Sequence, residues 1–322
     1  MDKSTKIIGI DISKDTFDIW SEELGHKKFD NSLKGFRLFN KLLDDKTLCV
    51  MEYTASYYQK LALFLYDKQI QVSVVNPLTI KRFIQMKLQR NKTDKSDSKM
   101  IAYYASEQDV KLWKPAADYI EQCSVIHTTI SVYFKQSTAL KNKLHSFTSM
   151  GVKGKVVTSL KRQIRNINNE IKELENILEQ LIKENEPELL TNLVSIKGIG
   201  KKTAILLIVT TSGFTKFENA RQLSSFFGLA PAEKSSGSSV RGKTRITKKG
   251  NGMVRNHLFM CSFTASQTNL QCSNLYNRIV AKGKSKKLAL IAVCNKLLKQ
   301  VFAVAKSGIP YDPYYKSCIP SL

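Results

Sequence analysis

Apolar and polar residues alternate along the first 112 residues in a way that predicts strands separated by helices. Short apolar or alternating runs predict strands at 7–12, 16–20, 27–31, 48–52 and 72–76. Apolar residues at helical spacing predict helices at 36–43, 57–66 and 95–106. The predicted order is three strands, a helix, and then strand, helix, strand and helix, which indicates an α/β domain over residues 1–112.

Between residues 113 and 188 the apolar positions recur at alternating spacings of three and four, which is the a/d pattern of a heptad repeat. The stripe consists of Val157, Leu160, Ile164, Ile167, Ile171, Leu174, Leu178 and Leu181. A second stripe runs from Tyr119 to Phe147, and a turn fits at 151–154. The pattern predicts a long helical hairpin or coiled coil, packed either within one chain or between subunits. The strict stripe with charged flanks favours pairing between subunits.

Residues 189–322 are predicted to form a mainly α-helical domain. Near its start Gly198 and Gly200 are followed by Lys201 and Lys202, an order typical of a helix-hairpin-helix. Backbone N–H groups in such a turn can bind a phosphate, with the lysines beside it. A plain helical hairpin explains the glycines but not the lysines, so phosphate contact is the interpretation that we prefer.

The composition indicates a nucleic-acid partner. The 322 residues carry a net charge of +24 with a pI of about 9.7, and a polyanion is the expected partner of such a chain. No apolar run of about 18 residues and no leader are visible, so neither a membrane span nor a secretion signal is expected. The six cysteines and four histidines are scattered, which indicates reduced thiols in a cytoplasmic protein and no zinc site.

Four acidic residues stand where a metal-dependent nuclease needs them. Asp11 and Glu52 each end a predicted strand, and Asp94 and Asp97 lie three positions apart beside a predicted helix, so that they can share a helical face. Taken singly, each is more often a turn former, a helix N-cap or a partner of the helix dipole. Together, in a very basic chain, they predict a site for two Mg²⁺ ions, which clamp the attacking and leaving oxygens in phosphoryl transfer.

A serine- and glycine-rich segment follows a predicted helix at 219–227. Small residues allow a backbone to approach a phosphate closely. Cations suited to neutralising that phosphate are Arg241, Lys243, Arg245, Lys248 and Lys249. A serine beside Gly237 can attack phosphorus if a metal or a base activates it. By composition alone such a segment is usually a flexible loop, and no nucleophile is chosen on that basis.

These motifs, in this order, resemble the bridge-RNA-guided recombinases of insertion sequences, over almost the whole chain. The matching segments are Ile8–Asp11, Met51–Thr54, Arg90–Asp97, Phe227–Pro231, Ser236–Gly242, Thr247–Gly250 and Arg255. The resemblance implies an N-terminal RuvC-like DEDD domain of the ribonuclease H type, with a mixed sheet and flanking helices, and a C-terminal serine transposase domain. One departure is Tyr53-Thr54-Ala55-Ser56 after the second acid, where the family usually has Ala, then Thr or Ser, then Gly.

The resemblance also implies a specific activity. Ser236 would attack the scissile phosphate and form a 5′-phosphoserine link, in a composite site with the DEDD metals of another protomer. A non-coding bridge RNA would pair with double-stranded donor and target DNA, so that base pairing reads sequence while the protein holds backbones. The subunits would form a homodimer that assembles into a homotetramer, in the cytoplasm at the bacterial nucleoid. Nucleic-acid contacts are expected from Lys92, Lys201, Lys202, Arg241, Lys243, Arg245, Lys248, Lys249 and Arg255.

Two other functions remain open on the residues. A RuvC-like Mg²⁺-dependent endonuclease or Holliday-junction resolvase would use water as the nucleophile and leave Ser236 incidental. A covalent protein–DNA adduct distinguishes the recombinase from that enzyme. A non-catalytic RNA- and DNA-binding scaffold would use only the basic helices and the hairpin motif. The four intact acids disfavour the scaffold, and metal-dependent strand cleavage excludes it.

Overall fold

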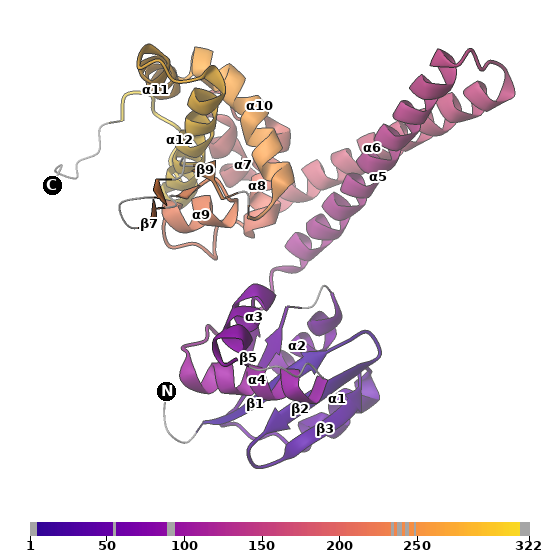
Figure 1. The fold of residues 1–322 in the computed structure, drawn as a ribbon, viewed down its shortest axis with the longest axis vertical. Helices are drawn as coiled ribbons and strands as arrows, with labels where there is room; N and C mark the ends of the chain where they lie inside the picture. Colours follow the sequence, from indigo (N-terminus) through magenta and orange to yellow (C-terminus); the bar gives the residue numbers. More distant parts are fainter. Residues whose placement is uncertain are drawn as a thin grey trace. The chain divides into compact units, whose positions relative to one another are not determined.

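The chain forms two compact units, Met1–Pro115 and Ala116–Leu322, in a computed structural model (Figure 1). The structure describes residues 5–53, 56–88, 94–232, 235–236, 240–241, 245–247 and 249–315. The side chains at 94–95, 235–236 and 240–241 lie outside that description. The division lies three residues after the boundary predicted at residue 112, and the long helices that follow belong to the second unit.

Unit 1 is built on a five-stranded mixed sheet with the strand order β3-β2-β1-β4-β5. The strands are β1 (Lys6–Ile12), β2 (Thr16–Ser21), β3 (Gly25–Asp30), β4 (Thr47–Glu52) and β5 (Gln71–Val75). The first three pair antiparallel, while β4 runs parallel to both β1 and β5. The predicted mixed α/β fold is confirmed, and it is consistent with a RuvC-like domain.

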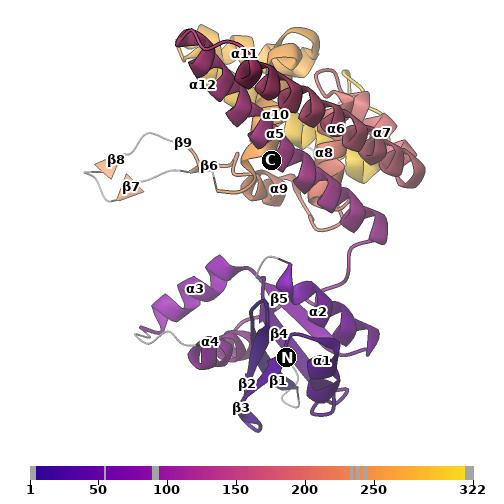
Figure 2. The same cartoon turned by 90° about the vertical axis from the view of Figure 1, so that its right-hand side faces the viewer.

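Side chains alternate along each strand and so divide between two cores. One core contains Ile10 of β1 and Met51 of β4, and it is covered by α1 (Leu33–Asn40) and α2 (Tyr57–Asp67). The other contains Val50 of β4 and is covered by α3 (Pro77–Met86) and α4 (Asp94–Glu107). Helices therefore flank both faces of the sheet (Figure 2). The sequence pattern did not predict α3.

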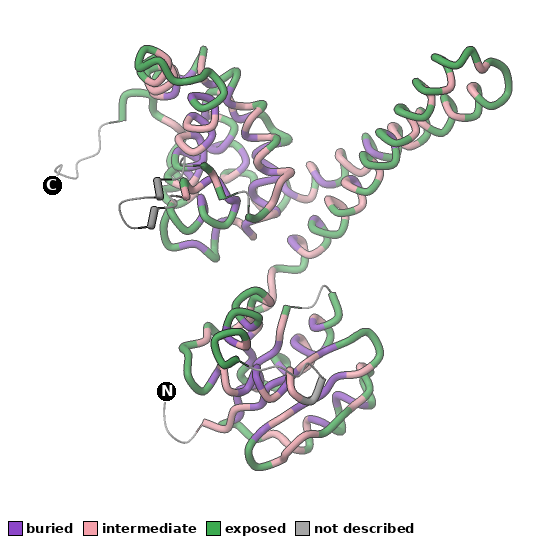
Figure 3. The backbone as a smooth tube through the Cα atoms, viewed as in Figure 1, coloured by how far each residue is buried: buried purple, intermediate pink, exposed green. Residues whose placement is uncertain are grey.

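Unit 2 begins with two long helices, α5 (Asp118–Ser149) and α6 (Lys155–Asn185), packed antiparallel within one chain. The heptad stripe lies between them, but its burial is uneven (Figure 3). Ile171 and Leu178 are buried near the rest of the unit, whereas Leu160 and Ile164 farther out are only half-buried. Pairing of this stripe with a second subunit stays a prediction.

The body of unit 2 is mainly helical, as predicted. Its helices are α7 (Pro187–Val194), α8 (Lys201–Thr211), α9 (Ala220–Phe226), α10 (Gly252–Thr268), α11 (Leu270–Ala281) and α12 (Lys286–Ser307). The described residues between α9 and α10 include four two-residue strands, β6 (Pro231–Ala232), β7 (Ser235–Ser236), β8 (Val240–Arg241) and β9 (Arg245–Ile246). Among the described helices, α12 alone is long and apolar enough to cross a membrane. It packs against α9, α10 and α11 with half of that stretch buried, as a core helix does.

Candidate active site and nucleic-acid surface

The ends of β1 and β4 bring two of the predicted acids to the same edge and face of the sheet. These strands are parallel neighbours, and the pairing between them ends with Ile10 and Met51. Asp11 and Glu52 are the next residues on the two strands. Ile10 and Met51 both point into the core under α1 and α2. Because side chains alternate along a strand, Asp11 and Glu52 point to the opposite face, which α4 covers.

The helix α4 lies on that face and runs antiparallel to β1. A Cβ atom added at Gly9 would lie 2.2 Å from the carbonyl oxygen of Ser98, so only glycine allows the two backbones to come this close. Ser106, near the C-terminal end of α4, and Lys6, at the start of β1, line the same shallow cavity. The first turn of α4 is therefore directed toward the end of β1 that carries Asp11.

The third and fourth predicted acids lie on this covering helix. It begins at Asp94, and Asp97 lies within the first turn, so both belong to the helix. Ser96 Oγ donates to Asp97 Oδ1 at 3.5 Å. Among the described side chains, which do not include that of Asp94, no three acids, histidines or cysteines form a metal-binding group. The donor set nevertheless fits a hard divalent cation, because carboxylates from two strand ends face a helix that carries two more.

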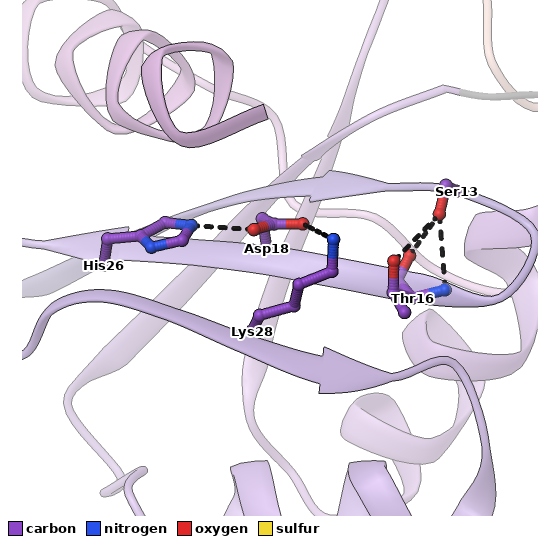
Figure 4. A network of polar contacts seen from close by, with 5 residues as sticks. All are labelled: Ser13, Thr16, Asp18, His26 and Lys28. Carbon is purple, nitrogen blue, oxygen red and sulfur yellow. Dashed lines mark hydrogen bonds and ion pairs between the residues drawn. The ribbon is translucent and has the colours of Figure 1, made fainter. Parts of the chain in front are cut away.

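A fifth acid, which the sequence analysis did not select, lies beside this site. Asp18 on β2 is paired with Asp11 across the sheet and is 5% exposed. Its carboxylate lies 2.7 Å from His26 Nε2 and 3.6 Å from Lys28 Nζ, both on β3 (Figure 4). These contacts orient the Asp18 carboxylate toward β3, where Lys28 balances its negative charge. The sequence signal that could have identified Asp18 is an acid at an inward-facing position of an apolar strand, because a buried acid requires a partner.

The predicted nucleophile segment starts and ends in short paired strands. The pairs are β6 with β9 and β7 with β8, both antiparallel. In the second pair Ser236 lies opposite Val240, and the pair projects away from the helices of unit 2 (Figure 2). The side chains of Ser236 and Arg241 lie outside the described ones, so their roles stay predictions.

A backbone contact fixes the base of this segment. Gly228 and Gly250 both have positive φ angles, +68° and +112°. A Cβ atom at Gly228 would lie 2.1 Å from the carbonyl oxygen of Lys249, so the two ends of the segment touch through their backbones. Arg255 Nη1 donates to the carbonyl oxygens of Phe227 at 2.9 Å and Gly250 at 3.1 Å. Arg255, predicted as a nucleic-acid contact, thus ties the two ends together.

The two lysines predicted to hold phosphate lie at the first turn of α8 and pair with α6. Lys201 Nζ is 3.0 Å from Glu179, and Lys202 Nζ is 2.7 Å from Glu175. The lysine side chains are 49% and 70% exposed, and exposed ion pairs contribute only about 0–1 kcal/mol. Phosphate contact here stays a prediction, and it requires each lysine to exchange a glutamate for a phosphate.

The other predicted contacts belong mostly to a segment without acids. Between Lys234 and Tyr311 the sequence contains 15 lysines and arginines and no aspartate or glutamate. Arg245 and Lys249 are exposed there. The predicted contacts outside the described residues are Lys92, Lys243 and Lys248. A groove of about 890 Å³ beside β9, α11 and α12 adds cations that the sequence analysis did not select, Lys287, Lys296 and Lys299. This surface is suited to a polyanion.

Two protein families match the chain, one in each half. Residues 8–149 match the IS110-type DEDD transposase family. Residues 190–277 match the family described as transposase IS116/IS110/IS902. The first match spans the sheet with its candidate acids, and the second covers most of α7, all of α8–α10, most of α11 and the serine-bearing segment.

Full-length relatives agree with these matches. The chain is 31% identical to the pilin gene-inverting protein of Moraxella bovis, over 96% of this chain and 98% of that protein. The same values hold for the protein of that name from Moraxella lacunata. It is 24% identical to the transposase for insertion sequence element IS1111A of Coxiella burnetii, over 79% of this chain and 76% of that protein.

Proposed function

The chain belongs to the IS116/IS110/IS902 family of transposases, and from this premise we propose that it recombines DNA through a covalent Ser236 intermediate under the guidance of a bridge RNA. Family membership shows a DNA-cleaving and rejoining enzyme whose DEDD domain indicates a divalent metal. The proposal adds the nucleophile, the two-metal site, the guide and the assembly.

The observation that carries the proposal is the shared face at the ends of β1 and β4. Asp11 and Glu52 point to that face, and the contact at Gly9 seats the helix of Asp94 and Asp97 on it. These four acids would hold two Mg²⁺ ions, which when bound neutralise the scissile phosphate and favour ionisation of the attacking hydroxyl. In this proposal the chain would contribute carboxylates from β1, β4 and α4 at one edge of the sheet.

In the proposed reaction the Ser236 hydroxyl oxygen attacks phosphorus. A serine–phosphorus bond forms while the bond from phosphorus to the 3′ oxygen breaks. The serine proton passes to a base or to water, and the departing 3′ oxygen takes up a proton. The 3′-OH of the partner strand then attacks the same phosphorus and releases Ser236. Each step exchanges one phosphate ester for another, so strands are rejoined without net hydrolysis.

The proposed assembly joins unit 1 of one protomer with unit 2 of another. The candidate acids lie in unit 1 and the candidate serine lies in unit 2. We expect a homodimer that assembles into a homotetramer on double-stranded donor and target DNA. A non-coding bridge RNA pairs with both DNAs, and the net charge of +24 supports binding to several backbones at once, in the cytoplasm at the nucleoid.

Trapping the covalent intermediate tests the proposal. Labelled DNA is incubated with protein and guide RNA, quenched, separated by denaturing electrophoresis and mapped by peptide analysis. The wild type and the matched control Ser235→Ala should give an adduct on Ser236, and Ser236→Ala should bind both nucleic acids but give none. Metal-dependent cleavage by the wild type without any adduct would favour the resolvase that uses water.

The likeness to two pilin gene-inverting proteins favours a second outcome of the same chemistry, inversion of a DNA segment. A plasmid that carries two recombination sites in opposite orientations should then yield the inverted product, read from restriction fragments. Products formed only between separate DNA molecules would leave transposition as the function.

A further inference from the structure

The charges of the α5–α6 hairpin are segregated along its length. From residue 122 to residue 169 the sequence contains eight lysines and arginines and no acid. They are Lys135, Lys141, Lys143, Lys153, Lys155, Lys161, Arg162 and Arg165. The acids of the hairpin lie at its other end, at Asp118 and Glu121 in α5 and from Glu170 onward in α6.

The hairpin contacts the body of unit 2 through its acidic end. In α5, Ser131 Oγ lies 3.7 Å from Met253 Sδ of α10. In α6, Glu175 and Glu179 pair with the two lysines of α8. All residues between Ser137 and Ile171 are described, and none of them is buried. The change of charge therefore coincides with the point where the hairpin leaves the body (Figure 3).

The cations of the basic half, residues 122–169, have no acidic partner among the described residues. Lys161 and Arg165 lie one turn apart on α6, and such like-charge neighbours destabilise a helix. Both are exposed, as are Lys155 and Arg162, because the apolar stripe faces inward between the two helices. The repulsion between these neighbouring cations is relieved when the anionic backbone of a nucleic acid lies along them.

We propose that the outer half of this hairpin, residues 132–169, is an arm that binds the phosphate backbone of duplex DNA at the recombination site. The inference deepens the proposed function by giving its DNA a binding surface. DNA is the occupant because it is the polyanion that family membership implies. Residues 132–149 of α5 rise 1.5 Å each, about 27 Å in all, which matches about eight base pairs of B-DNA.

Matched substitutions on one helix test the arm. In Arg162→Gln/Arg165→Gln two cations of the basic half are removed. In the control Lys172→Gln/Lys183→Gln two cations of the acidic half are removed. Glutamine keeps the helix propensity of both sites. Binding of the full chain to a duplex longer than the arm is measured without divalent metal, from about 50 to 200 mM salt. The arm variant should lower the slope of log affinity against log salt by about 2 and weaken binding roughly tenfold or more, with the control unchanged.

Three results would overturn the arm. The first is an equal salt slope for the arm variant and its control. The second is a loss of binding to an RNA duplex, assayed in parallel, with DNA binding unchanged. The third is an arm variant that sediments as a smaller species than the wild type. Should glutamine unfold the helix, Arg162→Lys/Arg165→Lys keeps the charge and must keep the binding. Binding is measured without cleavage, so failure of the serine mechanism leaves this result readable.

Discussion

Gly9 has no side chain, yet it controls how closely the helix that carries Asp97 approaches the strand that carries Asp11. An added Cβ would lie 2.2 Å from the Ser98 carbonyl oxygen and 2.4 Å from the Ala102 amide nitrogen. Both contacts are with backbone, which cannot swing aside as a flexible side chain does. A methyl group at this position must therefore lift α4 from the sheet, and the carboxylates move with it.

We expect Gly9→Ala to destabilise unit 1 by about 1–3 kcal/mol, as overpacking does. We also expect it to slow cleavage by roughly a hundredfold, because about 1 Å of misplacement has that effect at a catalytic site. Denaturant unfolding and cleavage rates measure the two effects. Gly200→Ala is the stability control, since its Cβ meets no atom within 4 Å. Wild-type activity of the Gly9 variant would show that α4 does not position the acids.

Each candidate acid is open to a direct test. We expect Asp97→Ala to abolish DNA cleavage while leaving folding and RNA binding largely intact, because the lost carboxylate leaves the phosphate-binding cations without a ligand. Asp11→Ala, Glu52→Ala and Asp94→Ala should behave alike. Cleavage is measured on labelled DNA over a range of Mg²⁺ concentrations. A wild-type rate in Asp97→Ala would remove this residue from the metal site.

Two histidines of unit 2 make its stability depend on pH. Burial lowers the pKa of His127, and the nearby His257 lowers it further. Burial likewise lowers the pKa of His257, with Lys202 adding repulsion. Because the folded state binds these protons more weakly than the unfolded state, stability is complete above about pH 6.5 and falls as the pH drops below it.

We expect the thermal unfolding midpoint of the wild type to decline between about pH 7 and pH 5.5, and His257→Gln to flatten that decline. Scanning calorimetry of both proteins at matched ionic strength measures the difference. Parallel curves for the wild type and the variant would contradict the assignment.

At the scale of elements, alternation and helical spacing predicted the five strands of the sheet and most of its helices. The helix α3 was not predicted, because Pro77 directly follows the strand predicted at 72–76 and proline often ends an element. Proline is also favoured in the first helical turn, and Asn76 caps this helix by accepting from the Leu78 amide at 2.9 Å. The strands β6–β9 were missed because two-residue ladders have no period to recognise. These local features decide boundaries without altering the fold class.

Some features of the candidate site could likewise be predicted from the sequence, and others could not. The four acids and the basic segments could be selected from residue type and order. The ion pairs of Lys201 and Lys202 could not, because their partners on α6 depend on how that helix packs against α8. Gly198 also acquires a different role, since its Cβ would lie 2.6 Å from Ala265 Cβ of α10. Packing of α10 therefore explains this glycine without a phosphate.

The seam of the hairpin gives a prediction at this scale. Ile171 is buried within the chain, whereas Ile164 is half-buried where the hairpin has left the body. If a second subunit covers this half-buried part of the stripe, Ile164→Lys should dissociate the dimer, since burying a charge in a subunit seam costs several kcal/mol. Ile171→Lys should destabilise the hairpin itself. Sedimentation and circular dichroism measure the two effects, and a monomeric wild type would make the stripe purely intramolecular.

At the scale of the whole molecule, the chemistry is divided between the two units. The candidate acids belong to residues before Pro115, and the serine and the long acid-free basic segment belong to residues after it. Neither unit alone carries the candidate serine together with the four candidate acids. The proposed mechanism therefore requires residues of both units at one site, from one protomer or from two, and the two alternatives differ in a measurable way.

Mixing two inactive proteins distinguishes them. Ser236→Ala retains intact acids, and Asp11→Ala retains an intact serine. If each site combines two protomers, equal mixing makes half of the dimers mixed, and each mixed dimer has one intact site out of two. We therefore expect roughly a quarter of the wild-type adduct in a symmetric dimer. A mixture of Ser236→Ala with the double variant Ser236→Ala/Asp11→Ala is the control and should give no adduct. If the mixture of single variants also gave none, while each exchanged subunits with the wild type, the acids and the serine would have to meet within one protomer.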